Sequence, residues 1–408
     1  MSGSTGVGFE IERVATSDAR GPGHSPHGFD PSVEIDGRGA RAITRVSRRL
    51  PSGETERQAL VWDLSTGFHV PGAWIALHPD GERALRREAD GRVTFCDVAS
   101  GASLCTLDLE SPRHVAMSPD SPHAVLSVRD TVPAKASPRI AQVVYDLSTG
   151  ATLHELSGSF LLEAFVPGGR LLSVDERNVL TLWNLASGRS ELVGKGPREQ
   201  PRVLRLDREG RRAVVVGAKG NLQVWDLAER RIVHEHDALA RLRGGPGEHL
   251  RLLADGRRLV SEGQFLDVLD LETGALDCSW VARDPNRDRI LAVAPLAAGP
   301  FVAVLMCRGL FDPNTLEVWD VDRRLRVGLV EVTDAQVLAV APGGRAVVAG
   351  DEGVVSFQLH ARAGVALPPQ PALAAPKAAS RAAAKKAPAK KAPAKKTPAK
   401  KAAPKRSR

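Results

Sequence analysis

Short apolar runs alternate with turn residues along the first 360 positions of the chain. Runs such as RAVVV (212–216), RLVS (258–261) and RAVVA (345–349) are bounded by turn sequences such as PDG (79–81) and ADG (254–256). Runs of four to six apolar residues, rich in Val and Leu and bounded by Pro, Asp and Gly, indicate antiparallel strands joined by tight turns. The pattern therefore predicts an all-β protein.

A second pattern recurs at longer intervals. Eight segments place an Asp, Asn or Gln directly after an apolar residue, as in ALVWDLSTG (59–67) and VVYDLSTG (143–150). The eight anchor residues, which are 34 to 50 positions apart, are Asp63, Asp97, Asp146, Asn184, Asp226, Asp270, Asp320 and Gln358. Three to four strands in a unit of this length are typical of one blade of a β-propeller.

The Trp-Asp pairs and the WDLSTG and SPDG-like elements make residues 29–366 resemble the WD40-repeat family, in a divergent, bacterial form. The resemblance implies structural roles: the Trp packs between blades and the Asp caps turn amides. The structural repeat residues are Trp62, Asp63, Trp183, Trp225, Asp226, Trp319 and Asp320. The Gly-His dipeptide that completes a buried His–Ser/Thr–Asp–Trp tetrad in many such repeats is absent. We therefore expect blade rigidity to depend more on strand packing than on polar tetrads.

The number of blades depends on the two ends of the repeat region. Residues 32–44 (SVEIDGRGARAIT) supply the first strands of an extra unit, which favours eight four-stranded blades. A seven-bladed ring with an irregular N-terminal segment is the alternative. Propellers close by pairing both chain ends in one blade, which leaves no open sheet edge there. The closing strand is either Phe9–Val14, from a flexible segment at 1–28, or Gly364–Leu367, at the end of the propeller domain (29–366).

Positive charge is concentrated at the C-terminal end. The formal net charge of the 408 residues is +8, but residues 361–408 hold 14 Lys and Arg and no Asp or Glu. The other 360 residues hold 42 Lys and Arg against 48 Asp and Glu, a net charge of −6. The segment 367–408 contains repeats such as APAKK, which resemble the Lys/Ala/Pro tails of linker histones. It has little apolar surface to bury and repels itself, so we predict a disordered tail.

Lysines at this density favour a polyanionic partner. Contacts between many cations and phosphates release counterions and bind DNA or RNA without base specificity. No aromatic residue lies among the lysines, which argues against stacking on single strands. We expect DNA, or another polyanion, to be bound by Lys385, Lys386, Lys390, Lys391, Lys395, Lys396, Lys400, Lys401, Lys405 and Arg406.

Candidate chemistry in the propeller is sparse. The segment VLDLETGALDCSW (268–280) resembles a quinoprotein repeat, but Trp280 is the only Trp at its position and the paired cysteines of such enzymes are missing. The only HxH sequence, His234 and His236, supplies too few ligands for a metal ion, and we place both imidazoles on one face of an outer strand. We expect no catalytic, cofactor or metal-binding residues. The alternative is a quinoprotein-like enzyme or ligand sensor with a site at the central channel.

The remaining features concern location. The four cysteines lie far apart, which argues against a disulfide-rich secreted domain, and no signal peptide is visible. Ile290–Cys307 has 18 uncharged residues, but Pro295, Gly299 and Pro300 interrupt it, so we predict two buried strands joined by a turn. We expect a cytoplasmic monomer, with nucleoid association as a further option. Its expected role is a non-enzymatic scaffold that binds an unidentified protein and is tethered to DNA or another polyanion by its tail.

Overall fold

The chain divides into two compact units, Met1–Ala374 and Ala375–Arg408. The structure, a computed structural model, describes residues 7–18, 32–49, 55–110, 112, 114–129, 140–156, 160–237, 250–261, 265–281, 288–297, 299–309, 313–333, 335–350 and 353–363. All described residues belong to the first unit. The tail and its predicted contacts therefore lie outside the described residues.

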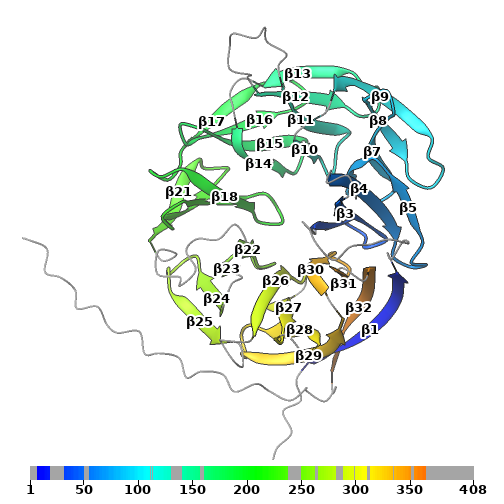
Figure 1. Ribbon diagram of the computed structural model, residues 1–408. Coiled ribbons are helices and arrows are strands. Elements are labelled where there is room, and N and C mark those ends of the chain that lie inside the picture. Colours follow the sequence, from blue (N-terminus) through cyan, green and yellow to red (C-terminus); the bar gives the residue numbers. More distant parts are fainter. Residues whose placement is uncertain are drawn as a thin grey trace, which may run out of the picture. The chain divides into compact units, whose positions relative to one another are not determined.

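The described part of the chain forms eight four-stranded antiparallel sheets arranged in a ring (Figure 1). Each sheet is one blade, and in blades 1 to 7 the first strand along the chain lies nearest the ring axis, whereas blade 8 has β30 innermost and the N-terminal strand β1 outermost. The predicted all-β propeller of eight blades is confirmed, and the seven-bladed alternative is wrong. The segment SVEIDGRGARAIT (32–44) supplies the paired inner strands of the extra blade.

In each of the first four blades, the strands follow one another from the innermost to the outermost. Blade 1 contains β2 (Ser32–Ile35), β3 (Arg41–Arg49), β4 (Thr55–Asp63) and β5 (His69–Gly72). Blade 2 contains β6 (Trp74–Leu77), β7 (Arg83–Arg87), β8 (Arg92–Asp97) and β9 (Ser103–Glu110). Blade 3 contains β10 (His114–Met117), β11 (His123–Arg129), β12 (Ile140–Asp146) and β13 (Thr152–Leu156). Blade 4 contains β14 (Phe160–Val166), β15 (Arg170–Asp175), β16 (Val179–Asn184) and β17 (Ser190–Lys195).

The other four blades follow the same order, from the innermost strand to the outermost. Blade 5 contains β18 (Pro201–Leu206), β19 (Arg212–Gly217), β20 (Leu222–Asp226) and β21 (Arg231–His236). Blade 6 contains β22 (Leu250–Leu252), β23 (Arg258–Ser261), β24 (Phe265–Asp270) and β25 (Leu276–Val281). Blade 7 contains β26 (Arg289–Pro295), β27 (Phe301–Cys307), β28 (Asn314–Asp320) and β29 (Leu325–Val332). Blade 8 contains β30 (Ala335–Val340), β31 (Arg345–Gly350), β32 (Gly353–Ala363) and β1 (Val7–Asp18).

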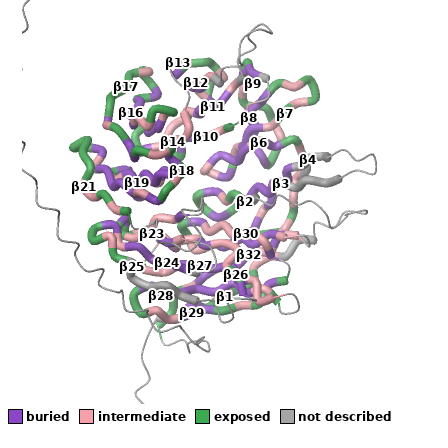
Figure 2. Tube along the Cα trace, turned by 60° about the vertical axis from the view of Figure 1, so that its left-hand side comes forward, coloured by how far each residue is buried: buried purple, intermediate pink, exposed green. Residues whose placement is uncertain are grey.

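Burial explains the apolar runs. Neighbouring blades cover both faces of the middle strands, so β19 and β20 are buried along almost their whole length. The outer strands β17 and β21 are covered on fewer sides and are largely exposed, as Figure 2 shows. The core is therefore a set of apolar layers between blades, and each layer joins two neighbouring blades.

The ring closes through the N-terminus. Strand β1 pairs with β32 along its length, from Val7 opposite Ala363 to Asp18 opposite Gly353. Phe9 of β1 meets Phe301 of blade 7 edge to face, with ring centroids 4.9 Å apart. The segment 1–28 thus contributes the outermost strand of blade 8, and the propeller includes residues before position 29.

The long apolar segment Ile290–Cys307 forms two strands, as predicted. Strands β26 and β27 pair within blade 7, and the turn between them contains Gly299 with a φ of 71°. Among the described residues, no helix is both long and apolar enough to span a membrane.

The tryptophans of the third strands keep buried polar partners. The indole nitrogen of Trp62 donates to Thr44 Oγ1 at 2.8 Å, and that of Trp183 donates to Ser173 Oγ at 2.9 Å. In blade 7 the indole of Trp319 donates instead to Glu317 Oε2 at 2.8 Å. The indole hydrogen bonds therefore add polar contacts to the packing between blades, although the Gly-His dipeptides are missing.

Candidate functional site

Nearly every blade contributes two turns to the same end of the ring. The first turn joins the first and second strands, and the second turn joins the third and fourth strands. Because strands alternate in direction within a blade, both turns lie at the same end of the ring. We call this end the turn face. It is the part of the described surface on which the repeat motifs gather.

The anchor residues hold the second turn together. Asp63 Oδ1 accepts hydrogen bonds from Ser65 N at 2.9 Å, Ser65 Oγ at 2.6 Å and Thr66 N at 3.0 Å. Equivalent contacts to the turn that follows are made by Asp97, Asp146, Asn184, Asp226, Asp270 and Asp320. The capping role predicted for the Asp of the Trp-Asp pairs is therefore present. Gln358 departs from it, since its side chain donates to Gly343 O instead.

The caps lower the pKa of the turn carboxyls. Burial alone would raise the pKa of Asp63, but the hydrogen bonds from Ser65 and Thr66 outweigh it and lower that pKa. In Asp97 the hydrogen bonds from Ser100 lower the pKa, and in Asp146 those from Ser148 do the same. A carboxylate held in this way is a poor general base, because its lowered pKa moves it further from neutral pH. These groups are structural.

The glycine that ends the second turn leaves space for a histidine side chain of the preceding blade. Gly274 has a φ of 68°, and a Cβ there would lie 2.4 Å from the imidazole of His236 in blade 5. His236 Nε2 lies 2.9 Å from Leu271 O of the same turn, so the imidazole joins blade 5 to blade 6. His154 contacts Ala186 O of blade 4 in a similar way, at 3.2 Å. These histidines therefore connect blades.

The HxH pair lies on the outer strand of blade 5. The rings of His234 and His236 stack on one face of the outer strand β21, 6.0 Å apart, which is the arrangement predicted from the sequence. Across the described residues, no group of three His, Cys, Asp or Glu side chains could hold a metal ion. Trp280 lies in β25 at the position equivalent to that of His236 in β21. His236 is opposite Leu222 and Trp280 is opposite Leu266, and each of these leucines lies four positions before the anchor residue of its blade. The side chain of Trp280 lies outside the part of the chain that the structure describes.

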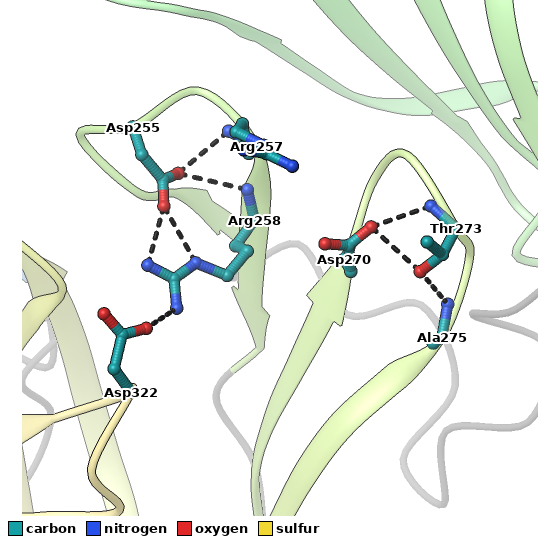
Figure 3. Close-up of a pocket in the computed structure, with 7 residues that line it drawn as sticks. All are labelled: Asp255, Arg257, Arg258, Asp270, Thr273, Ala275 and Asp322. Atoms are coloured by element: carbon teal, nitrogen blue, oxygen red, sulfur yellow. Dashed lines mark hydrogen bonds and ion pairs between the residues drawn. The ribbon is translucent and has the colours of Figure 1, made fainter.

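A polar cavity of about 480 Å³ opens on the turn face at blades 6 and 7 (Figure 3). Its lining residues are Asp255, Arg257, Arg258, Asp270, Thr273, Ala275 and Asp322. Arg258 binds Asp255 of its own turn, with Nη2 and Oδ2 2.7 Å apart, and also Asp322 of blade 7. No nucleophile with an adjacent base lines the cavity. Its charged groups contact one another and join blade 6 to blade 7.

A second cavity, of about 340 Å³, lies on the turn face around blade 1. Its lining residues are Arg38, Gly39, Ala40, Arg41, Asp63, Ser65, Asp80, Gly81, Glu82 and Arg345, which belong to blades 8, 1 and 2. Arg38 Nη1 lies 2.9 Å from Glu82 Oε1, and Arg41 Nη1 donates to Gly81 O at 2.6 Å. Arginine contacts therefore join neighbouring blades in this cavity as they do in the first.

The ring also carries short basic runs, such as Arg45–Arg49 and Arg211-Arg212. Arg45 pairs with Glu34 at 2.6 Å and donates to Ile75 O, so it joins blade 1 to blade 2. Arg211 is exposed, with its nearest carboxylate, on Glu209, 3.8 Å away. The ten tail residues expected to bind a polyanion all lie outside the described residues.

Comparison with known proteins gives similarity in fold. No protein-family model matches the chain, and no curated protein matches it. The computationally designed Ika8 protein is similar in structure, with a TM-score of 0.52 and 16% identity over 78% of this chain and 93% of that one. The β-propeller domain of Cps50 (Swd1) from Myceliophteria thermophila has a TM-score of 0.47 and 15% identity, covering 70% of this chain and 96% of that one.

Proposed function

We propose that this WD40-like β-propeller is a non-enzymatic scaffold, tethered to DNA or another polyanion by its lysine-rich tail. The rigid ring presents a protein partner with the turn face, where both described cavities open. The tail raises the concentration of the ring near the polyanion. We further propose a cytoplasmic monomer of bacterial type, with nucleoid association as a further option.

The observation that carries this proposal is the separation of charge. On the ring, Arg38 and Arg258 at the turn-face cavities contact carboxylates, and residues 1–360 sum to −6. The tail, residues 367–408, holds 13 Lys and Arg with no acidic residue among them. A polyanion therefore meets unopposed positive charge in the tail. The likeness of the tail to linker-histone tails supports the same partner.

The salt dependence of DNA binding tests the tether. The full chain should bind duplexes of native and scrambled sequence with equal affinity. That affinity should fall about a thousandfold or more between about 50 and 200 mM salt, because each phosphate contact releases a counterion. Fluorescence anisotropy at several salt concentrations gives the slope. A shallow slope, or a sequence-selective footprint, contradicts a purely electrostatic tether.

The scaffold role needs a separate test on the turn face. Affinity capture compares the full chain with a variant whose Phe68, 68% exposed at the second turn of blade 1, is replaced by Asp. A partner of the turn face should be captured by the full chain and lost from Phe68→Asp. The exposed Leu192, on the outer strand of blade 4, provides a matched control as Leu192→Asp. Equal loss from both variants contradicts use of the turn face.

A further inference from the structure

Six of the eight blades begin their second strand with an arginine at the turn face. These residues are Arg41, Arg83, Arg170, Arg212, Arg258 and Arg345. In blades 1, 2, 5 and 6 an aspartate anchor lies directly opposite the arginine on the third strand. In blade 8 the neutral Gln358 lies opposite Arg345, and its amide donates to Gly343 O. Arg345 therefore has no anchor carboxylate across the strand pair.

The turn before the second strand supplies a carboxylate in other blades. In blade 2, Asp80 Oδ2 lies 2.6 Å from Arg83 Nε and 2.5 Å from Arg83 Nη2, and blade 6 has the equivalent contact. The equivalent position in blade 8 is Gly343, since it too stands one residue before the glycine that closes the turn. Arg345 thus lacks the turn carboxylate as well as the anchor carboxylate.

The guanidinium group of Arg345 is partly withdrawn from water without a compensating partner. Its Nη1 is buried and donates to no acceptor among the described residues. Gly39 of blade 1 approaches the aliphatic stem so closely that a Cβ there would lie 2.6 Å from Arg345 Cβ. A charged group that loses contact with water costs free energy unless an opposite charge compensates it. An unpaired group of this kind in a folded protein points to a bound water or ion.

Arg345 lines the cavity of about 340 Å³ at blades 8, 1 and 2, together with five other charged residues. Those residues are Arg38, Arg41, Asp63, Asp80 and Glu82. Arg38 pairs with Glu82, and Asp80 pairs with an arginine outside the lining. Arg41 and Arg345 then stand against Asp63, which leaves a surplus of one positive charge. One carboxylate matches that surplus better than a phosphate group, which carries about two negative charges at neutral pH.

We propose that this cavity binds a small carboxylate anion and that Arg345 is its main contact. Because Nη1 is covered, the edge that carries Nε and Nη2 is left for the ligand. Arg83 uses the same edge to bind Asp80 in blade 2, so the ligand carboxylate takes the place of the missing turn acid. Two parallel hydrogen bonds of this kind are strong and specific. The site goes beyond the scaffold role and does not depend on it.

Thermal melts of the full chain test this site with acetate, inorganic phosphate and the neutral acetamide, at an ionic strength held constant with chloride. Acetate should raise the Tm of the wild type, because it binds the folded ring, and acetamide should not. Arg345→Gln should weaken acetate binding about tenfold or more, as measured from the dependence of Tm on acetate concentration. Arg170→Gln is the matched control and should respond as the wild type does. Arg170 holds the same position in blade 4, opposite the neutral Asn184, and lines neither described cavity.

The same variants test whether Arg345 lacks a partner in the protein. In chloride alone, Arg345→Gln should melt no lower than the wild type, because the substitution removes an uncompensated, partly buried charge. Arg345→Lys keeps the charge but loses the forked geometry, so its response to acetate should lie between those of the wild type and Arg345→Gln. A clearly lower Tm of Arg345→Gln in chloride overturns the proposal. Equal acetate responses of the wild type and Arg345→Gln, or a larger response to phosphate than to acetate, also overturn it.

Discussion

The propeller and the tail use charged residues in opposite ways. In blade 7, Glu317 is 1% exposed and binds Arg308, Arg326 and the indole of Trp319. The tail, residues 367–408, holds 13 Lys and Arg and no Asp or Glu. Charge in the ring therefore supports the fold, whereas we propose that charge in the tail binds a partner. Changes in the ring should alter stability without altering polyanion binding, and changes in the tail should do the reverse.

The largest effect on the ring is expected from Glu317→Ala. The substitution leaves Arg326, 6% exposed, and the largely buried Arg308 without their shared carboxylate. Removing one member of a buried charge network costs about 3–5 kcal/mol of unfolding free energy. Denaturant titration measures that loss, and duplex binding at low salt should stay unchanged wherever the variant is folded. The control, the exposed Glu331→Ala in β29, should change stability by no more than about 0.5 kcal/mol.

A smaller effect is expected where the tryptophan partner is neutral. Thr44→Val removes the acceptor of the Trp62 indole, which is 1% exposed. A buried donor left without a partner costs about 1–3 kcal/mol. Replacing Trp62 by Phe in the same chain removes the donor as well, so the double variant should lose less than the sum of the two single losses. Strict additivity would mean that the Trp62–Thr44 hydrogen bond contributes nothing to blade 1.

A change of under about 1 kcal/mol is expected at Arg230, where two small effects oppose each other. Arg230 has a φ of 54° at the turn position that glycine fills in blades 1 to 4 and 6, and it pairs with the exposed Glu191 of blade 4. Arg230→Gly relieves left-handed strain of about 1 kcal/mol and loses a surface ion pair of similar or smaller value. Arg230→Ala loses the pair but keeps the strain. We expect the Gly variant to melt at a higher temperature than the Ala variant; the reverse order would contradict this account of the turn.

The smallest effect concerns pH. The pKa of His114 is raised, chiefly by its hydrogen bond with Glu163. Because the folded state binds this proton more tightly, the stabilisation is complete below the ordinary value of 6.5 and is lost as pH rises through the raised pKa. The His114 side chain is 61% exposed, so the effect should be a few tenths of a kcal/mol. The difference in Tm between the wild type and His114→Gln should shrink from pH 6 to pH 9; a growing difference would show the wrong sign.

Most of the propeller could be predicted from the sequence because its signals are local. Spacing of the anchor residues predicts the blades, and Pro, Asp and Gly predict the turns. The closing strand could not be chosen, since Phe9–Val14 and Gly364–Leu367 are both short runs with apolar residues. Only the pairing of β1 with β32 decides between them.

The polar sites were harder to predict because they depend on distant residues. Glu317 stands two positions before Trp319 in NTLEVWD, where a buried acid has no local explanation. Its arginines come from the segment after β27 and from β29, and only the fold brings them together. Arg205 of blade 5 likewise donates to Leu250 O of blade 6, 45 positions further along the chain, because neighbouring blades align their inner strands.

The most direct test of the tether deletes residues 367–408 and measures two properties of the remaining chain. Thermal melting reports on the ring, and duplex DNA binding at about 50 mM salt reports on the polyanion contact. The account predicts a nearly unchanged Tm together with loss of DNA binding. Undiminished DNA binding by the shortened chain would contradict it, because the ring itself would then hold the polyanion.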